Sequence, residues 1–135
     1  MQLNLETDYA IRIVYVIANA NGRIDAKNIA KNSCVSLKFS LKILRKLVMS
    51  GIVISYMGTN GGYELAKNPK DISIYDIIEV IEGKYQFNRC VDHEYICSRT
   101  GQEKDCPFHR IFCKMTDEVS TQLKTYTFDK FINET

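Results

Sequence analysis

Three cysteines lie close together in a segment rich in charged residues. Cys90, Cys97 and Cys106 are spaced C-x6-C-x8-C and separate two segments with helical periodicity. Thiolates are soft, negatively charged ligands that suit iron and zinc. The pattern favours a soft-metal or iron–sulfur site over three unrelated cysteines in a loop.

The last of these cysteines has a helix start directly after it. Cys106 precedes Pro107, and proline is favoured at the first position of a helix. Exposed amides at a helix N-terminus lower the pKa of a thiol. We therefore expect Cys106 to have thiolate character.

The number of cysteines bears on the location of the protein. The length of 135 residues suits one domain. Five cysteines are an odd number, which does not suit a closed disulfide framework. Residues 1–6 have no basic region or cleavage site of a signal peptide, and no stretch reaches the ~18 apolar residues of a membrane span. Clustered cysteines in a reducing cytosol are more often metal-binding or redox-active than paired. We expect a cytoplasmic protein.

A long stretch without acidic residues is the second informative feature. Residues 26–63 contain no Asp or Glu, although the whole chain has a net charge of only +2. This favours contact with a nucleic-acid backbone over a merely solvated basic face. The basic residues of the stretch are Lys27, Lys31, Lys38, Lys42, Arg45 and Lys46.

The periodicity of the apolar residues predicts a mostly helical chain with one β-hairpin. Two short strands around the glycine-rich residues 58–62 predict the hairpin. Helical spacing predicts helices over residues 7–20, 26–31, 36–50 and 74–82, with one of roughly six turns from residue 107. Thr7 is expected to cap the first helix and Asp25 the second.

The second and third predicted helices have the layout of a helix-turn-helix, whose second helix enters the major groove of DNA. A hairpin directly after it is a wing. In the third helix we expect Leu37, Leu41, Leu44 and Leu47 to be buried, and Cys34 to be a small buried residue in the turn. The candidates for DNA contact are Ser36, Lys38, Ser40, Lys42 and Arg45; Arg12 either contacts the backbone or braces the first helix.

The expected fold is mostly α with a small β-hairpin wing. We expect a winged helix-turn-helix domain over residues 1–83, a cysteine-bearing sensor loop over 84–106, and a dimerisation helix with a tail over 107–135. The last helix carries a single apolar stripe from Phe108 to Tyr126. Such a stripe needs a partner, so a homodimer is expected.

These elements, in this order, resemble the IscR/NsrR-like (Rrf-type) family of bacterial winged-helix iron–sulfur transcription regulators. The resemblance covers essentially the whole chain. It rests on Met1-x-Leu3 with residues 7–12, on residues 36–51 of the recognition helix, on Gly61-Gly62-Tyr63 of the wing, and on residues 78–83 before the cysteine loop.

The resemblance implies a dimer that binds palindromic promoter sites in double-stranded DNA. It also implies a [2Fe-2S] or [4Fe-4S] cluster held by the three loop cysteines and a variable fourth ligand. Asp8 matches the aspartate that reaches across the dimer in NsrR-like members, and His109 matches the C-x-x-H arrangement of IscR-like members. Their simpler roles are a helix N-terminal charge and a surface imidazole, and Cys113 is a weaker candidate.

Two features depart from the family pattern. The cysteine spacing is longer than the common x5-x5 type, so the cluster type stays open. Residues 57–60 of the wing provide no Lys or Arg for a minor-groove contact.

Three functions are compatible with the sequence. The first is a DNA-binding regulator, expected to be a repressor, controlled by a cluster that senses redox state, nitric oxide or iron–sulfur supply. The second is a cluster-free regulator of the same fold, controlled by a partner protein or by thiol oxidation. The third is a zinc-stabilised interaction module. The sequence has no C-x-x-C, catalytic carboxylate pair or nucleotide motif, so an enzyme is not expected.

Overall fold

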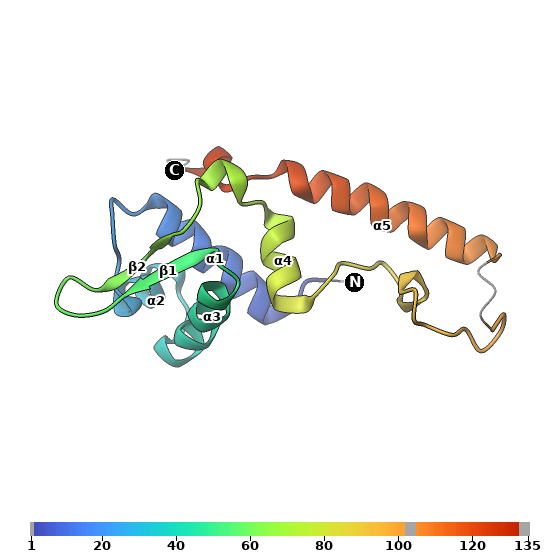
Figure 1. Cartoon of the computed structure of the whole chain (residues 1–135), viewed down its shortest axis with the longest axis horizontal. Coiled ribbons are helices and arrows are strands. Elements are labelled where there is room, and N and C mark those ends of the chain that lie inside the picture. The colour runs from blue at the N-terminus through green and yellow to red at the C-terminus, as the bar shows by residue number, and fades with distance from the viewer. Residues whose placement is uncertain (1, 102–104, 133–135) are drawn as a thin grey trace.

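The computed structural model describes residues 2–101 and 105–132 of the chain. Within these residues five α-helices accompany one antiparallel two-stranded hairpin, and Figure 1 shows the hairpin reaching out from the helices. The expected fold class is confirmed. Met1 of the N-terminal motif, residues 102–104 of the expected loop and residues 133–135 of the expected tail lie outside the described residues.

The predicted elements are present in the predicted order, with ends that differ by a few residues. The helices are α1 (Leu5–Asn19), α2 (Ala26–Ser33), α3 (Leu37–Met49), α4 (Ile74–Glu82) and α5 (Pro107–Thr125). The strands are β1 (Val53–Tyr56) and β2 (Gly62–Leu65), and short 3-10 turns η1 (Pro69–Asp71), η2 (Arg89–Val91) and η3 (Phe128–Phe131) complete the structure.

Helix α1 forms the centre of the core. Its side chains Ala10, Ile13, Val14 and Ile17 are at most 3% exposed, and the helix contacts α2, α3, α4, β2 and η3. The prediction that Thr7 caps this helix is wrong. The cap is Asn4, whose side chain accepts a hydrogen bond from the Thr7 amide at 2.8 Å, because the helix begins two residues earlier than predicted.

Side-chain caps start the other helices of the winged helix-turn-helix. Asp25 caps α2 as predicted, and Ser36 caps α3. Ser73 and Asp76 form a capping box at α4, in which each side chain satisfies a backbone N–H of the other residue. These local signals fix the helix starts independently of the core.

The buried stripe of α3 differs from the predicted one. Its buried residues are Ser40, Ile43, Leu44 and Leu47, whereas Leu37 and Leu41 are 40% and 43% exposed. The buried set is rotated by about one residue toward Ser40, since the small serine lets the helix pack closely against its neighbours. The expected burial of Leu37 and Leu41 is therefore wrong.

The turn between α2 and α3 also differs from the expectation. Cys34 has a left-handed backbone (φ 58°, ψ 43°) and is exposed. Its amide still closes α2 by bonding to the carbonyls of that helix's last turn, and the next residue, Val35, takes the buried position. The prediction of a buried Cys34 is therefore wrong.

The segment after α5 returns to the core. Phe128 is 1% exposed and is the largest fully buried side chain of the described residues. Its amide donates to Ile72 O at 2.9 Å, and Tyr126 O accepts from the Ile74 amide at 2.9 Å. The expected tail thus completes the core of the winged helix-turn-helix, although short aromatic segments of this kind have no period to reveal it in the sequence.

A single β-bridge joins the α1–α2 connection to the hairpin. The Ile24 amide donates to Tyr63 O at 3.0 Å, and the Tyr63 amide donates to Ile24 O at 2.8 Å. A Cβ on Gly62 would lie 2.9 Å from Ile24 O, and one on Gly61 would lie 2.6 Å from Tyr56 O. Gly62 therefore permits the close backbone approach at this bridge, and Gly61 permits the tight turn of the hairpin.

We predict that Gly62→Ala destabilises the protein by about 1–3 kcal/mol. Gly62 has φ +142° and its new Cβ would press on the Ile24 backbone. Gly58→Ala is the matched control, because Gly58 has φ +91° but no atom within 4 Å of the added Cβ. Urea denaturation of both variants measures the difference, and equal losses would contradict a role for the Ile24 approach.

Candidate functional site

The cysteine loop is fastened to α5 by one buried polar residue and one aromatic pair. Thr116, which is 6% exposed, accepts a hydrogen bond from the Phe87 amide at 2.9 Å. The rings of Phe87 and Phe112 stack with centroids 5.5 Å apart. These contacts set the start of the loop beside the first half of α5, at the end of the molecule away from α2 and α3 (Figure 1).

All three loop cysteines line one pocket. The pocket has a volume of about 300 Å³, and His109 lines it together with Cys90, Cys97 and Cys106. Aromatic and polar side chains complete the wall, among them Tyr95, Arg99, Phe108 and Phe112. The fold therefore brings together the four residues that the sequence suggested as sulfur and imidazole ligands.

A tight turn surrounds Cys97. The backbone groups of Cys97 and Gly101 bond to each other at 2.7 and 3.1 Å, with Gly101 at φ +68°. The turn points amides at the sulfur, and the Arg99 amide lies 3.4 Å from Cys97 Sγ. Backbone hydrogen bonding by Thr100 and then Arg99 lowers the pKa of the Cys97 thiol to about 7, because both amides favour the thiolate.

Cys106 is the N-cap residue of α5, as the sequence predicted. The backbone amide of His109 lowers the pKa of the Cys106 thiol, and Arg99 adds to this effect. The Arg99 guanidinium donates to Cys106 Sγ at 2.9 Å. Arg99 thus contacts both Cys97 and Cys106, a role that could not be predicted because nothing in the sequence spacing distinguishes this arginine.

The candidate fourth ligands occupy different places. His109 lines the pocket, and its Nε2 lies 3.4 Å from Cys113 Sγ on the next turn of α5. Asp8 lies on α1 and pairs with Arg12 at 3.0 Å. Within one copy of the chain the structure brings His109, and not Asp8, to the loop cysteines.

The sulfur atoms share a pocket but do not yet surround a single point. In the described part of the chain no three Cys, His, Asp or Glu side chains form a group that could hold a metal ion. Arg99 occupies the space beside Cys106 instead. Metal binding would therefore require these side chains to rearrange, Arg99 among them.

The exposed face of α3 carries most of the predicted DNA contacts. Ser36, Lys38, Lys42 and Arg45 are exposed, and Leu37 and Leu41 lie exposed among them. Cationic side chains contact phosphates, and apolar ones can contact thymine methyl groups. Ser40 does not belong to this face, because its side chain is fully buried, and its position does not support the predicted contact.

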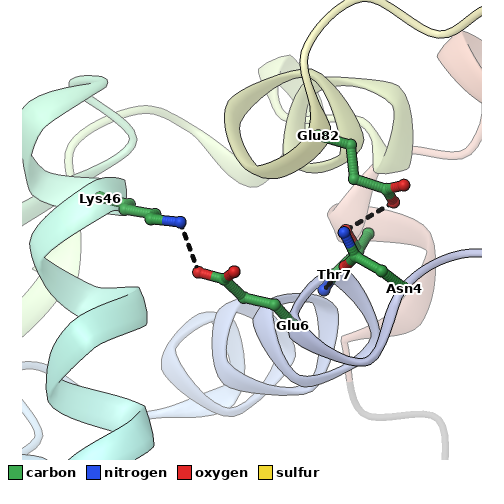
Figure 2. Close-up of polar contacts among 5 residues, drawn as sticks. All are labelled: Asn4, Glu6, Thr7, Lys46 and Glu82. Carbon is green, nitrogen blue, oxygen red and sulfur yellow. Dashed lines mark hydrogen bonds and ion pairs between the residues drawn. The ribbon is translucent and has the colours of Figure 1, made fainter.

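Lys46 differs from the predicted DNA-contact residues of α3 because it forms an ion pair with another helix. Its Nζ lies 2.6 Å from Glu6 Oε1, and the Glu6 side chain is only 18% exposed. On the next residue of α1, Thr7 Oγ1 donates to Glu82 Oε2 of α4 at 2.6 Å. Figure 2 shows the first turn of α1 lying between α3 and α4 through these two contacts.

Arg12 is engaged within α1. It pairs with Asp8 at 3.0 Å, and its guanidinium lies 5.2 Å from the centre of the Tyr9 ring. This position fits the bracing role, one of the two that the sequence left open for this residue.

No described helix is both long and apolar enough to cross a bilayer.

Comparisons with known proteins agree with this architecture. The profile of the family described as Rrf2, iron-dependent transcriptional regulator, matches residues 3–134. The regulator IscR of Pectobacterium atrosepticum is 25% identical over 98% of this chain and 80% of its own. The regulator NsrR of Bacillus subtilis is 29% identical over 68% of this chain and 64% of its own.

A solved structure is also similar over the whole chain. The global cysteine regulator CymR of B. subtilis superposes with a TM-score of 0.78 at 25% identity, covering 100% of this chain and 98% of that one.

We predict that alkylation of Cys97 by iodoacetamide reaches half its maximal rate near pH 7 in reduced, chelator-treated protein. The pKa of this thiol is lowered to about 7, so the reactive thiolate is lost only below that pH. Peptide mass spectrometry over a pH series measures the rate. The urea-unfolded chain is the control, with its half-point near the ordinary value of 9.0, and coincident profiles would contradict the effect of the turn.

Proposed function

The chain belongs to the Rrf2 family and is a transcriptional regulator, not an enzyme, and on that premise we propose that an iron–sulfur cluster held by the loop cysteines controls its binding to promoter DNA. The observation that carries this proposal is the single pocket lined by Cys90, Cys97, Cys106 and His109. Three thiols and an imidazole around one pocket are a donor set that suits a shared metal centre.

The chemistry of the donor set fits a cluster. Thiolates are the usual ligands of [2Fe-2S] and [4Fe-4S] clusters, and N–H groups directed at the sulfurs tune them. Cys97 has such amides around it, and the pKa of both Cys97 and Cys106 is lowered. A bound cluster would supply an iron centre that responds to oxygen, nitric oxide or iron–sulfur supply. The family description as iron-dependent supports the same conclusion.

Two residues remain candidates for the fourth ligand. His109 is the candidate that one protomer can offer, since it lines the pocket. Asp8 remains the candidate of a second protomer, because its carboxylate is half-exposed beside Arg12.

A homodimer is part of the proposal. Helix α5 has 19 residues, of which Thr116 alone is buried in the described structure. Its apolar stripe includes the exposed Phe108 and Ile111, at 61% and 54%. A second copy of α5 would cover this stripe and pair two recognition helices for a palindromic site in double-stranded DNA. This function implies a cytoplasmic location.

The winged helix-turn-helix supplies the DNA-binding surface in this proposal. Lys38, Lys42 and Arg45 share the exposed face of α3 and would approach the major groove and its phosphates. The contacts of the first turn of α1 with α3 and α4 (Figure 2) link this face to the helix that leads into the cysteine loop.

A cluster-free regulator is the second candidate, and three observations favour it. No described group of three or more side chains could hold a metal ion as it stands, and Arg99 bonds to Cys106 Sγ. The similar CymR is named a global cysteine regulator. In this alternative, thiol oxidation or a partner protein would control DNA binding.

Anaerobic purification followed by iron, sulfide and zinc determination with an absorption spectrum tests the proposal. We expect iron and acid-labile sulfide in the wild-type protein and their loss in Cys90→Ala, Cys97→Ala and Cys106→Ala. Cys34→Ala is the matched control, because Cys34 lies outside the pocket, and it should keep the cluster. His109→Ala and Asp8→Ala then identify the fourth ligand.

Other metal contents of the purified protein would separate the alternatives. Zinc without sulfide would support a zinc-stabilised interaction module. A protein that stays free of metal after reconstitution but still binds DNA would support the cluster-free regulator. Either result would exclude the cluster.

We predict that Lys42→Gln and Lys46→Gln act differently on DNA binding. Exposed Lys42 should contribute a phosphate contact, so its loss should reduce the slope of log affinity against log salt by roughly 0.9 for each contact. Lys46 is paired with Glu6, so its loss should leave the slope unchanged and lower the urea midpoint. Fluorescence anisotropy on a duplex selected by the wild-type protein gives both slopes, and identical slopes would contradict the assignment.

A further inference from the structure

The wing has no cationic residue of its own. Residues 47–66, which include the whole hairpin, contain no Lys or Arg. A wing that approaches DNA without a positive charge gains little from the phosphate backbone. The structure places Arg23, from the connection between α1 and α2, on this hairpin.

Two contacts hold the Arg23 side chain against the wing. Its Nη1 donates to Asn60 O near the tip of the hairpin at 3.0 Å. Its guanidinium carbon lies 3.4 Å from the centre of the Tyr56 ring. Arg23 is nevertheless an exposed residue.

The register of the strands explains this placement. Ile24 pairs with Tyr63, and Tyr63 with Ser55. Since side chains alternate along a strand, Arg23, Tyr56 and Glu64 share the opposite face of this small sheet. Gly62, opposite Tyr56, has no side chain to stand between the arginine and the ring.

The guanidinium stacks on the Tyr56 ring through its flat face. The stacking itself therefore uses none of the N–H donors along the edge of the guanidinium, which can bind a ligand. A guanidinium has five N–H donors in one plane and stacks through its face. Arg23 donates to Asn60 O and also interacts with the Tyr56 hydroxyl. The neighbouring carboxylate of Glu64 accepts from the Tyr56 hydroxyl at 2.5 Å. The side chain is thus ordered before binding, which reduces the entropy lost when a phosphate is bound.

We propose that Arg23 is the phosphate contact of the wing, supplied to the hairpin by the α1–α2 connection and positioned by Tyr56. This inference rests on the proposed DNA binding and adds a contact outside the basic stretch of residues 26–63. The competing role is a brace that holds the wing and touches no DNA.

Arg23→Gln separates the two roles. Glutamine keeps a donor for Asn60 O but removes the charge. We expect the slope of log affinity against log salt to fall by roughly 0.9 for each protomer bound, equally on a duplex selected by the wild-type protein and on a duplex of scrambled sequence. Lys130→Gln is the control, since Lys130 lies in η3 and bonds to Thr125 O, and its slope should match the wild type.

Further variants guard against a folding defect. Arg23→Lys keeps the charge and should keep the slope. Tyr56→Leu removes the ring beneath Arg23 and should reduce the slope, whereas Tyr56→Phe keeps the ring and should not. Urea denaturation confirms that each variant is folded under the binding conditions.

The outcomes are distinct. An unchanged slope in Arg23→Gln, with or without weaker binding, would make Arg23 a brace and overturn the inference. A wild-type protein that selects no duplex at all would instead overturn the proposed DNA binding, and the inference with it.

Discussion

The position of α1 is the constraint on which the rest of the structure depends. Its core-facing side chains from Ala10 to Ile17 are buried, and its first turn binds α3 through Glu6–Lys46 and α4 through Thr7–Glu82 (Figure 2). A close-packed interior allows no independent sliding of such a helix. Helix α3 and the helix that leads into the cysteine loop are therefore both held in place by contacts with α1.

Backbone amides lower the pKa of the Cys97 and Cys106 thiols more than charged neighbours do. The turn at residues 97–101 and the first turn of α5 direct amides at Cys97 and Cys106, which lowers the pKa of both thiols. Arg99 contributes its backbone amide to Cys97 and its guanidinium to Cys106. Stabilised thiolates serve equally for metal ligation and for thiol oxidation, so the same geometry accounts for both of the functions considered, and the metal content of the purified protein decides between them.

The charge pattern of the sequence is not the charge pattern of the surface. Lys46 belongs to the acid-free stretch, yet Glu6 from another helix neutralises it. Arg23 lies outside the stretch, yet the bridge at Ile24 brings it to a hairpin that has no cation. Folding thus removes one positive charge from the expected interface and adds another beside the wing. Both changes arise from pairing between segments distant in sequence.

The sequence by itself determined the helices, the hairpin and their order, because caps such as Asp25 and Ser73 and the spacing of apolar residues act within a few residues. It also determined which thiols and cations were available, and that Cys106 starts a helix. Only the tertiary structure decided that Ser40 is buried while Leu37 and Leu41 are exposed, that Phe128 returns to the core, and that His109 joins the cysteines in one pocket. The physical reason is that these outcomes depend on how whole helices rotate and pack against one another. The spacing of apolar residues along one helix leaves its rotation uncertain by about one residue.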